Sequence, residues 1–238
     1  MDADSETAAR LIAENVARVR ERMERAALAC GRDPLSVKLA AVAKTVPAHL
    51  VAAAVQAGAS IVAENYIQEA REKMEALPGL PVSWHFIGHL QTNKARYAAR
   101  LFDCIHAIDS ERLAGELSRR LLIENRRMAV FIEVNVGGEA SKSGVGPDEA
   151  PELAAKIAAL PHLDLKGLMT MPPWTENPED SRPYFAALRK LAEKIEELGI
   201  EKASMSELSM GLSHDFEEAI KEGATIIRVG TAIFGGRR

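Results

Sequence analysis

The chain has 238 residues, of which 47% are apolar and 27% charged, proportions typical of a soluble globular protein. The net charge of −4 predicts no nucleic-acid-binding surface, and Cys30 and Cys104 lie too far apart in sequence to suggest a disulfide framework. The N-terminal segment is acidic and amphipathic, unlike a signal peptide, and no apolar run reaches the length of a membrane span. We therefore expect a cytoplasmic protein with reduced thiols that binds neither nucleic acid nor membranes.

Short apolar segments alternate with longer amphipathic ones after a leading helix, which is predicted at about residues 5–29. Eight strands are expected at Val37–Ala43, Ser60–Glu64, Trp84–Ile87, Cys104–Ala107, Ala129–Asn135, Leu165–Met169, Glu207–Ser209 and Thr225–Val229. Helices are expected between them at Pro47–Ala57, Ile67–Leu77, Thr92–Leu101, Ser110–Glu124, Pro147–Leu160, Arg182–Leu198 and His214–Glu222. Glycines just past three of the helix ends suit the left-handed residue that often terminates a helix: Gly58, Gly199 and Gly223.

This alternation predicts βαβ units and a parallel sheet. Eight units in one domain, residues 1–238, favour a closed (β/α)8 TIM-type barrel with an extra N-terminal helix. The runner-up is an open doubly wound sheet. The residues after the first strand are AKTVP rather than a glycine-rich GxGxxG turn, which argues against that alternative.

Lys44 is the first candidate functional residue, because it ends an apolar strand immediately before a predicted helix. One interpretation is a snorkelling side chain, whose stem packs in the apolar layer while its ammonium reaches water. The other is a reactive amine, because a lysine at an apolar strand end can lose its charge and act as a nucleophile. Active sites of these barrels form at the carboxyl ends of the strands, so Lys44 belongs to the expected mouth.

Two segments have the composition of a phosphate-binding loop. In IIRVGTAIFGG a strand leads into Gly230 and Thr231, where backbone N–H groups and a hydroxyl can approach an anion. In LSMGLSHDFEEA, Ser209, Gly211 and Ser213 precede a helix in the same way. These are the loops after the seventh and eighth strands, where such barrels commonly bind phosphate.

Arg228 lies inside the last apolar strand, on the same face as Gly230. A guanidinium that faces a barrel interior needs a partner, which could be a carboxylate such as Glu64 or Glu133, or else a ligand. A ligand with a phosphate, an aromatic nitrogen and an aldehyde would suit the phosphate loops, Arg228 and Lys44 together. Pyridoxal 5′-phosphate (PLP), held to Lys44 as a Schiff base, has these groups.

From about residue 10 to its end, the chain closely resembles the pyridoxal phosphate homeostasis proteins (YggS/PROSC type), which are related to the barrel domain of bacterial alanine racemase. The resemblance lies in AVAKTVP, AENYIQEA, WHFIGHLQTNK, FIEVNVGGEASKSG, GLMTMPP, ELSMGLSHDFEEAI and IIRVGTAIFG. His214 and Phe216 depart from it, because relatives often carry Asp and Met there. The resemblance implies roles in PLP binding for eight residues: Lys44 as the Schiff-base lysine, Arg228 facing the pyridine nitrogen, Ser209, Gly230 and Thr231 at the phosphate, with Met210 beside them, and Asn65 and His85 near the cofactor.

Two functions fit these residues. The first, which we favour, is a non-catalytic carrier that buffers PLP, maintains PLP and amino-acid homeostasis, and delivers the cofactor to PLP-dependent apo-enzymes. The second is a PLP-dependent amino-acid racemase or a related enzyme. Racemisation needs an acid–base group on each face of the substrate, and Lys44 supplies only one. The racemase resemblance implies a second domain that brings a catalytic tyrosine across a dimer interface. This chain lacks such a segment, so we expect a monomer.

No metal site is expected. His85 and His89 are four residues apart but flank a strand, where this spacing does not give the geometry of a helical zinc motif. The other histidines, His49, His106, His162 and His214, carry no motif. The glycine-rich segment from Gly137 to Gly146, which contains Lys142, fits a mobile flap at the mouth, a second anion site or a solvated loop.

Overall fold

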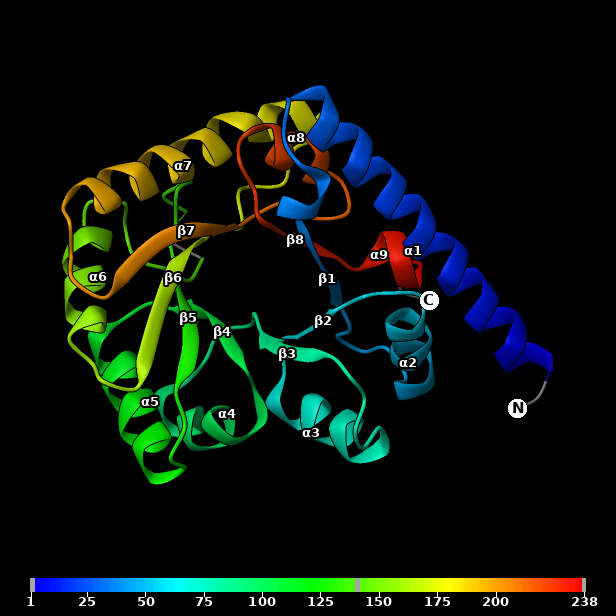
Figure 1. Ribbon diagram of the computed structural model, residues 1–238, viewed down its shortest axis with the longest axis horizontal. Coiled ribbons are helices and arrows are strands. Elements are labelled where there is room, and N and C mark those ends of the chain that lie inside the picture. The colour runs from blue at the N-terminus through cyan, green and yellow to red at the C-terminus, as the bar shows by residue number, and fades with distance from the viewer. Residues whose placement is uncertain (1–2, 140–141, 237–238) are drawn as a thin grey trace.

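A computed structural model describes residues 3–139 and 142–236. Its centre is a closed barrel of parallel strands in chain order, in which the last strand pairs with the first (Figure 1). The strands are β1 (Lys38–Val42), β2 (Ile61–Glu64), β3 (Ser83–Phe86), β4 (Cys104–Ile108), β5 (Met128–Glu133), β6 (Leu163–Met169), β7 (Ala203–Ser209) and β8 (Ile226–Val229). The predicted (β/α)8 barrel is confirmed, and the open sheet is excluded.

Helices surround the barrel (Figure 1). The α-helices are α1 (Ala3–Ala29), α2 (Ala48–Gln56), α3 (Ile67–Ala76), α4 (Ala95–Leu101), α5 (Glu111–Ile123), α6 (Ala150–Ala158), α7 (Arg182–Glu197), α8 (Phe216–Lys221) and α9 (Thr231–Phe234). Short 3-10 helices occur at η1 (Pro34–Ser36), η2 (Thr92–Lys94) and η3 (Pro178–Ser181). Within the described part of the chain, no helix is both long and apolar enough to cross a membrane.

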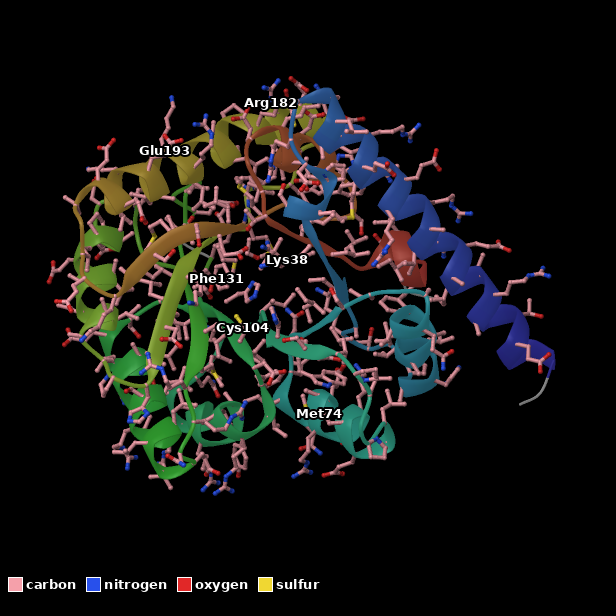
Figure 2. All side chains as sticks on the ribbon, viewed as in Figure 1. Lys38, Met74, Cys104, Phe131, Arg182 and Glu193 are labelled. Atoms are coloured by element: carbon pink, nitrogen blue, oxygen red, sulfur yellow. The ribbon has the colours of Figure 1, made fainter. Side chains whose placement is uncertain are left out.

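The two faces of the strands build two cores. Outward side chains pack against the helices in the larger core, whereas inward side chains form a smaller cluster that includes Ala40, Ala63, Cys104, Phe131 and Met169. In Figure 2, Cys104 and Phe131 lie inside the ring of strands, and Arg182 and Glu193 lie outside it on α7. The small alanines on β1 and β2 leave room inside the barrel for polar side chains, which the site uses.

Helix α1 connects the start of the barrel to its end. Its buried residues recur every three or four positions, at Ile12, Val16, Val19 and Met23. They face α2, α8 and α9, which lie on either side of the pairing between β1 and β8. The buried Asn15 side chain adds a hydrogen bond of 2.7 Å to the Ile233 carbonyl of α9. The extra N-terminal helix is therefore part of the closure of the barrel.

Among the predicted boundaries that differ from the observed ones, two have a clear physical reason. Strand β7 begins at Ala203 rather than Glu207, because its serines occupy positions at the solvent-facing start of the strand while Met205 is buried. Helix α6 begins at Ala150 rather than Pro147, because the Gly146 amide donates to the Glu149 carboxylate at 2.8 Å and the residues between them form a turn.

Candidate functional site

Lys44 lies where β1 ends, in a cleft of about 740 Å³. Gly230 and Thr231, which follow the neighbouring strand β8, line the same cleft, as do Val46 and Leu50. The closure of the barrel brings these two ends together, because β8 pairs directly with β1. Lys44 and the residues that begin with Gly230 and Thr231, here called the candidate phosphate loop, therefore share one cavity at the carboxyl end of the barrel.

A serine hydroxyl from the segment between β7 and α8 accepts hydrogen bonds from two amides of the candidate phosphate loop. The amides of Gly230 and Ala232 both donate to Ser213 Oγ, each at 3.2 Å. Two converging N–H groups beside a serine hydroxyl form a polar cradle of the kind that holds phosphate oxygens. Ser213, which the sequence singled out in the second of the two segments, therefore joins Gly230 and Thr231 as a candidate.

Ser209 and Met210 bond to other parts of the protein. Both side chains are completely buried, and neither lines the Lys44 cleft. The Ser209 carbonyl and hydroxyl both accept hydrogen bonds from Arg228, and the Met210 amide donates to the carbonyl of Ile226. The phosphate contact expected for Ser209 therefore stays a prediction.

Arg228 is buried in the barrel interior, with 3% of its surface exposed. Its guanidinium donates to the Ser209 carbonyl at 2.6 Å, to Ser209 Oγ at 2.8 Å and to the Thr170 carbonyl at 2.8 Å. Burial lowers its pKa to about 10, while the negative charges of Glu133 and Asp215 act in the opposite direction. The group therefore remains a cation near neutral pH.

The carboxylate partner considered for Arg228 is not found among the described residues. Glu64 instead pairs with Lys73, with 2.6 Å between Oε1 and Nζ. Glu133 attracts Arg228 electrostatically, but no ion pair within 4 Å joins them. The guanidinium instead donates to neutral oxygens of Ser209 and Thr170. These acceptors do not neutralise its positive charge.

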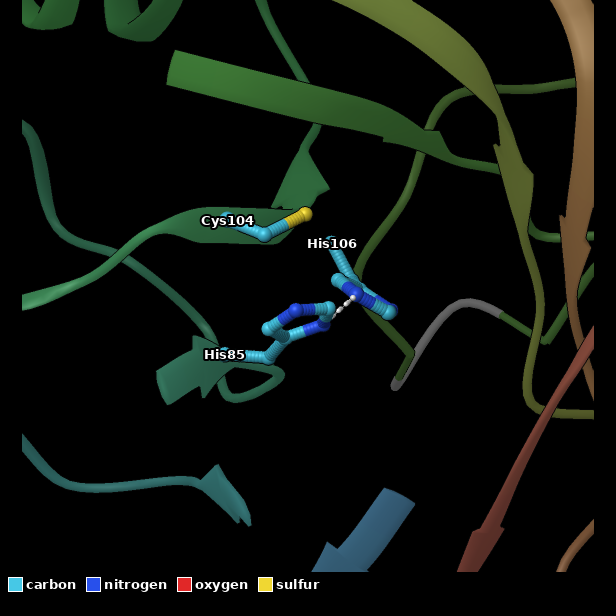
Figure 3. Close-up of side chains that lie close together, drawn as sticks. All are labelled: His85, Cys104 and His106. Carbon is cyan, nitrogen blue, oxygen red and sulfur yellow. Dashed lines mark hydrogen bonds between the residues drawn. The ribbon is translucent and has the colours of Figure 1, made fainter. Parts of the chain in front are cut away.

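A chain of hydrogen bonds continues from Arg228 through the barrel interior. Ser209 Oγ lies 2.8 Å from His106 Nδ1, and His106 Nε2 lies 2.9 Å from His85 Nδ1 (Figure 3). His85 Nε2 then lies 3.0 Å from Ser83 Oγ. His85 is thus placed inside the barrel beneath Arg228, and His106, which the sequence did not single out, connects the two.

Neutral imidazoles satisfy every bond in this chain. Burial lowers the pKa of His85 to about 4 and that of His106 well below its ordinary value, so both rings are neutral. In one arrangement Ser209 Oγ–H donates to His106 Nδ1, and the Nε2–H groups of His106 and His85 donate onward to Ser83 Oγ. In the reverse arrangement Ser83 Oγ–H donates to His85 Nε2, and the Nδ1–H groups donate towards Ser209 Oγ, which accepts this bond as well as that from Arg228. The chain therefore links Arg228 to Ser83 through neutral groups in either direction.

Cys104 lies beside the two imidazoles, and the nearest ligand atoms of the three residues are within 4.8 Å of one another (Figure 3). Burial raises the pKa of its thiol far above the ordinary range, so the sulfur is a neutral thiol. The facing nitrogens of His85 and His106 are already engaged with each other. We interpret the cluster as a neutral, hydrogen-bonded part of the barrel interior.

Asn65 follows β2 and is not among the residues that line the Lys44 cleft. It lines a second cleft of about 600 Å³ together with Tyr66, His89 and Tyr97. Its Oδ1 is buried and has no hydrogen-bond partner within the described ranges. Gly88 allows the close approach of the β3 end, because a Cβ there would lie 2.3 Å from the Asn65 carbonyl oxygen.

The glycine-rich segment after β5 is held at both of its described ends. Lys142 forms an ion pair with Glu139, and the Asn135 side chain donates to the Glu139 carbonyl at 2.9 Å. Residues 140–141 lie outside the described residues. The described part is therefore anchored to the end of β5.

The chain was compared with known proteins. Residues 10–238 match the family model of the alanine racemase N-terminal domain. The pyridoxal phosphate homeostasis protein of Aquifex aeolicus is 45% identical over 226 residues, which cover 94% of this chain and 98% of the relative. The chain belongs to this family. The corresponding protein of Pseudomonas aeruginosa is 46% identical, with 95% of this chain and 96% of the relative covered.

Among solved structures, PipY of Synechococcus elongatus PCC7942, determined with PLP bound, has a TM-score of 0.82 and 34% identity. The match covers 94% of this chain and 100% of PipY. The resemblance inferred from the sequence motifs is thus confirmed.

Proposed function

We propose that the protein is a carrier of PLP that holds the cofactor as a Schiff base on Lys44 and does not catalyse a reaction. The observation that carries the proposal is the shared cleft, in which Lys44 faces Gly230 and Thr231 across adjacent strand ends. The named function of its relatives and the PLP bound to PipY support the same ligand.

The residues at the cleft fit the groups of PLP. Bound PLP supplies an aldehyde, which condenses with an amine with loss of water. In this proposal Lys44 provides the amine, and Gly230, Thr231 and Ser213 receive the phosphate. Asn65, His85 and Met210 were expected beside the cofactor; their positions support an indirect contribution through the barrel interior and the β2 end.

Arg228 faces the pyridine nitrogen in this proposal. A guanidinium has only donors and keeps its proton, so the ring nitrogen opposite it would accept a hydrogen bond and stay unprotonated. Ser209 Oγ accepts a hydrogen bond from the guanidinium at 2.8 Å and lies 2.8 Å from His106 Nδ1, so His106 contributes through Ser209. A ring nitrogen without a proton makes the cofactor a weaker electron sink, which suits storage better than transamination.

The carrier role is supported by the groups that line the cleft. The chain has three tyrosines, Tyr66, Tyr97 and Tyr184, all of them in the described ranges, and none lines the Lys44 cleft. A second acid–base group for racemisation is therefore not evident beside Lys44 in that part of the chain. We further propose that the protein acts in the cytoplasm as a monomer and passes PLP to apo-enzymes.

The first experiment is an absorption spectrum of the protein with PLP, before and after borohydride, followed by a peptide mass map. A band near ~420 nm, typical of this linkage, that disappears on reduction and leaves added mass on the Lys44 peptide is the expected result. Lys44→Ala should lose the band, whereas Lys94→Ala, which alters an exposed lysine in the neighbouring cleft, should keep it. An unchanged band in Lys44→Ala would refute the linkage.

A second measurement separates the carrier from an enzyme. The PLP-loaded protein is incubated with L-amino acids, and the products are separated by chiral chromatography. The carrier predicts no D-enantiomer above that formed by Lys44→Ala. Turnover that Lys44→Ala abolishes would establish the racemase alternative.

A further inference from the structure

The turn that carries Lys44 has an unusual backbone. β1 ends at Val42 and α2 begins at Ala48, and between them Thr45 has a φ of 62°. A β-branched residue in the left-handed region is a conformational outlier that needs outside support. The residue directly after Lys44 is therefore held in a conformation that it would not adopt by itself.

Helix α3 supplies that support on both sides of Lys44. The carbonyl of Ala43 accepts a hydrogen bond from Lys73 Nζ at 2.5 Å. The amide of Thr45 donates to Glu69 Oε2 at 2.7 Å. The peptide groups before and after Lys44 are thus each bound by a charged side chain from the same helix.

Glu69 and Lys73, which we call the charged clamp on the Lys44 turn, are themselves held in place by other contacts. Lys73 also contacts Glu64 Oε1 at 2.6 Å and Glu69 Oε2 at 3.3 Å, so its three protons all have acceptors. The side chain of Lys73 is 8% exposed, that of Glu64 is fully buried, and that of Glu69 is 30% exposed. Buried ion pairs often give no more stability than an apolar replacement would, so stability alone is a poor reason for this one.

We propose that Glu69 and Lys73, with Glu64 beneath them, are positioning residues that hold the Lys44 turn so that the lysine amine is presented to the PLP aldehyde. This inference rests on the proposed function, because it assigns these residues a role in forming the Lys44 linkage. They act on the backbone beside Lys44 and need not touch the cofactor.

The test compares Glu69→Ala with two matched variants. Glu69→Gln keeps an oxygen that can accept from Thr45. Glu72→Gln changes an exposed carboxylate on the same helix, whose Oε1 accepts from Gln68. The first readout is amide hydrogen exchange of Thr45 by NMR, without PLP. The second is the rate at which borohydride traps PLP on the Lys44 peptide.

In Glu69→Ala we expect Thr45 exchange to accelerate and trapping to slow, each by about tenfold or more, the value of a hydrogen bond to a charged group. Glu69→Gln should recover much of both, and Glu72→Gln should match the wild type. Unchanged exchange or unchanged trapping in Glu69→Ala would overturn the proposal. If wild-type protein gave no adduct, the proposed function would fail, and Thr45 exchange would still show whether Glu69 holds the turn.

A second variant removes the contribution of Lys73 to the charged clamp. Lys73→Met combined with Glu64→Leu replaces the buried ion pair by apolar side chains, which avoids leaving an unpaired buried charge. It removes the hydrogen bond to the Ala43 carbonyl, so trapping on Lys44 should slow while the cooperative urea transition persists. Wild-type trapping rates in a folded double variant would exclude Lys73 from the clamp.

Discussion

Glu133, the last residue of β5, makes the stability of the protein depend on pH near neutrality. Burial raises the pKa of its carboxyl to about 7, and the neighbouring charge of Asp109 adds to the effect, while Arg228 acts against it. A raised pKa means that the folded state holds the proton more tightly than the unfolded state. The protein therefore loses stability as the pH rises from 4.5, the pKa of this carboxyl in the unfolded chain, towards 7. Glu133→Gln should remove this loss.

The size of this loss of stability follows from the pKa values of Glu133 in the unfolded and folded states. The difference between the ordinary 4.5 and the folded value of about 7 corresponds to about 3 kcal/mol, at 1.36 kcal/mol per pKa unit. Below 4.5 both states are protonated, so the group contributes no pH dependence there. Above about 7 both states are ionised, and the full penalty is present.

Urea unfolding of the PLP-free protein at several pH values, followed by the fluorescence of the buried Trp84, measures this penalty. Other titrating groups cancel in the difference between Glu133→Gln and wild type. We expect that difference to rise by about 3 kcal/mol in favour of the variant between pH 4.5 and pH 8. A difference that stays constant to within about 1 kcal/mol would refute the assigned burial of the Glu133 charge.

Two further substitutions test the packing around the site. Ser209→Ala removes the hydroxyl between Arg228 and the histidine pair, so unfolding in urea should require about 2–3 kcal/mol less free energy; an unaltered transition would contradict the hydrogen-bonded chain. Gly211 has a φ of +92° and a Cβ there would lie 2.6 Å from that of Ala219, so Gly211→Ala should cost more than about 2 kcal/mol. Gly31→Ala is its control, because Gly31 has a similar φ of +73° but no atom within 4 Å of the added Cβ. Equal losses of stability in the two glycine variants would show that crowding is unimportant at Gly211.

The fold was predictable because strands of a parallel barrel are buried on both faces and the helices between them are amphipathic. All eight expected strands overlap observed ones. The weakest prediction concerned β7, whose first half lies at an exposed edge and carries Ser204 and Ser206, so its sequence does not resemble a buried strand. The local hydrophobic pattern of a sequence indicates which residues are buried. It therefore does not identify the part of a strand that extends beyond the core.

The site was predictable only in part. The rule that strand ends carry function placed Lys44, Gly230 and Thr231 in one cleft. It could not identify the partners of Arg228, because these depend on which inward side chains of different strands lie at the same height in the barrel. That height is set by strand tilt and register, which a single sequence does not encode locally.

The charged clamp around Lys44 had a partial signal in the sequence. Glu69 and Lys73 are spaced i, i+4 on a helix, which is a common surface pair. What the spacing could not reveal is that this face of α3 turns inward, where Lys73 reaches a strand-end carbonyl and a buried carboxylate. Burial of a charged helix face is a tertiary property.

The placement of α1 has a consequence for how the protein is made. Its apolar stripe is synthesised first, but α8 and α9, which cover much of it, emerge about 200 residues later. At ordinary ribosomal speeds that delay is roughly 10–40 seconds. Throughout this interval the stripe lacks its contacts with α8 and α9, and β1 lacks β8 along one edge. Nascent chains are therefore expected to be targets for holding chaperones until the final strand leaves the ribosome.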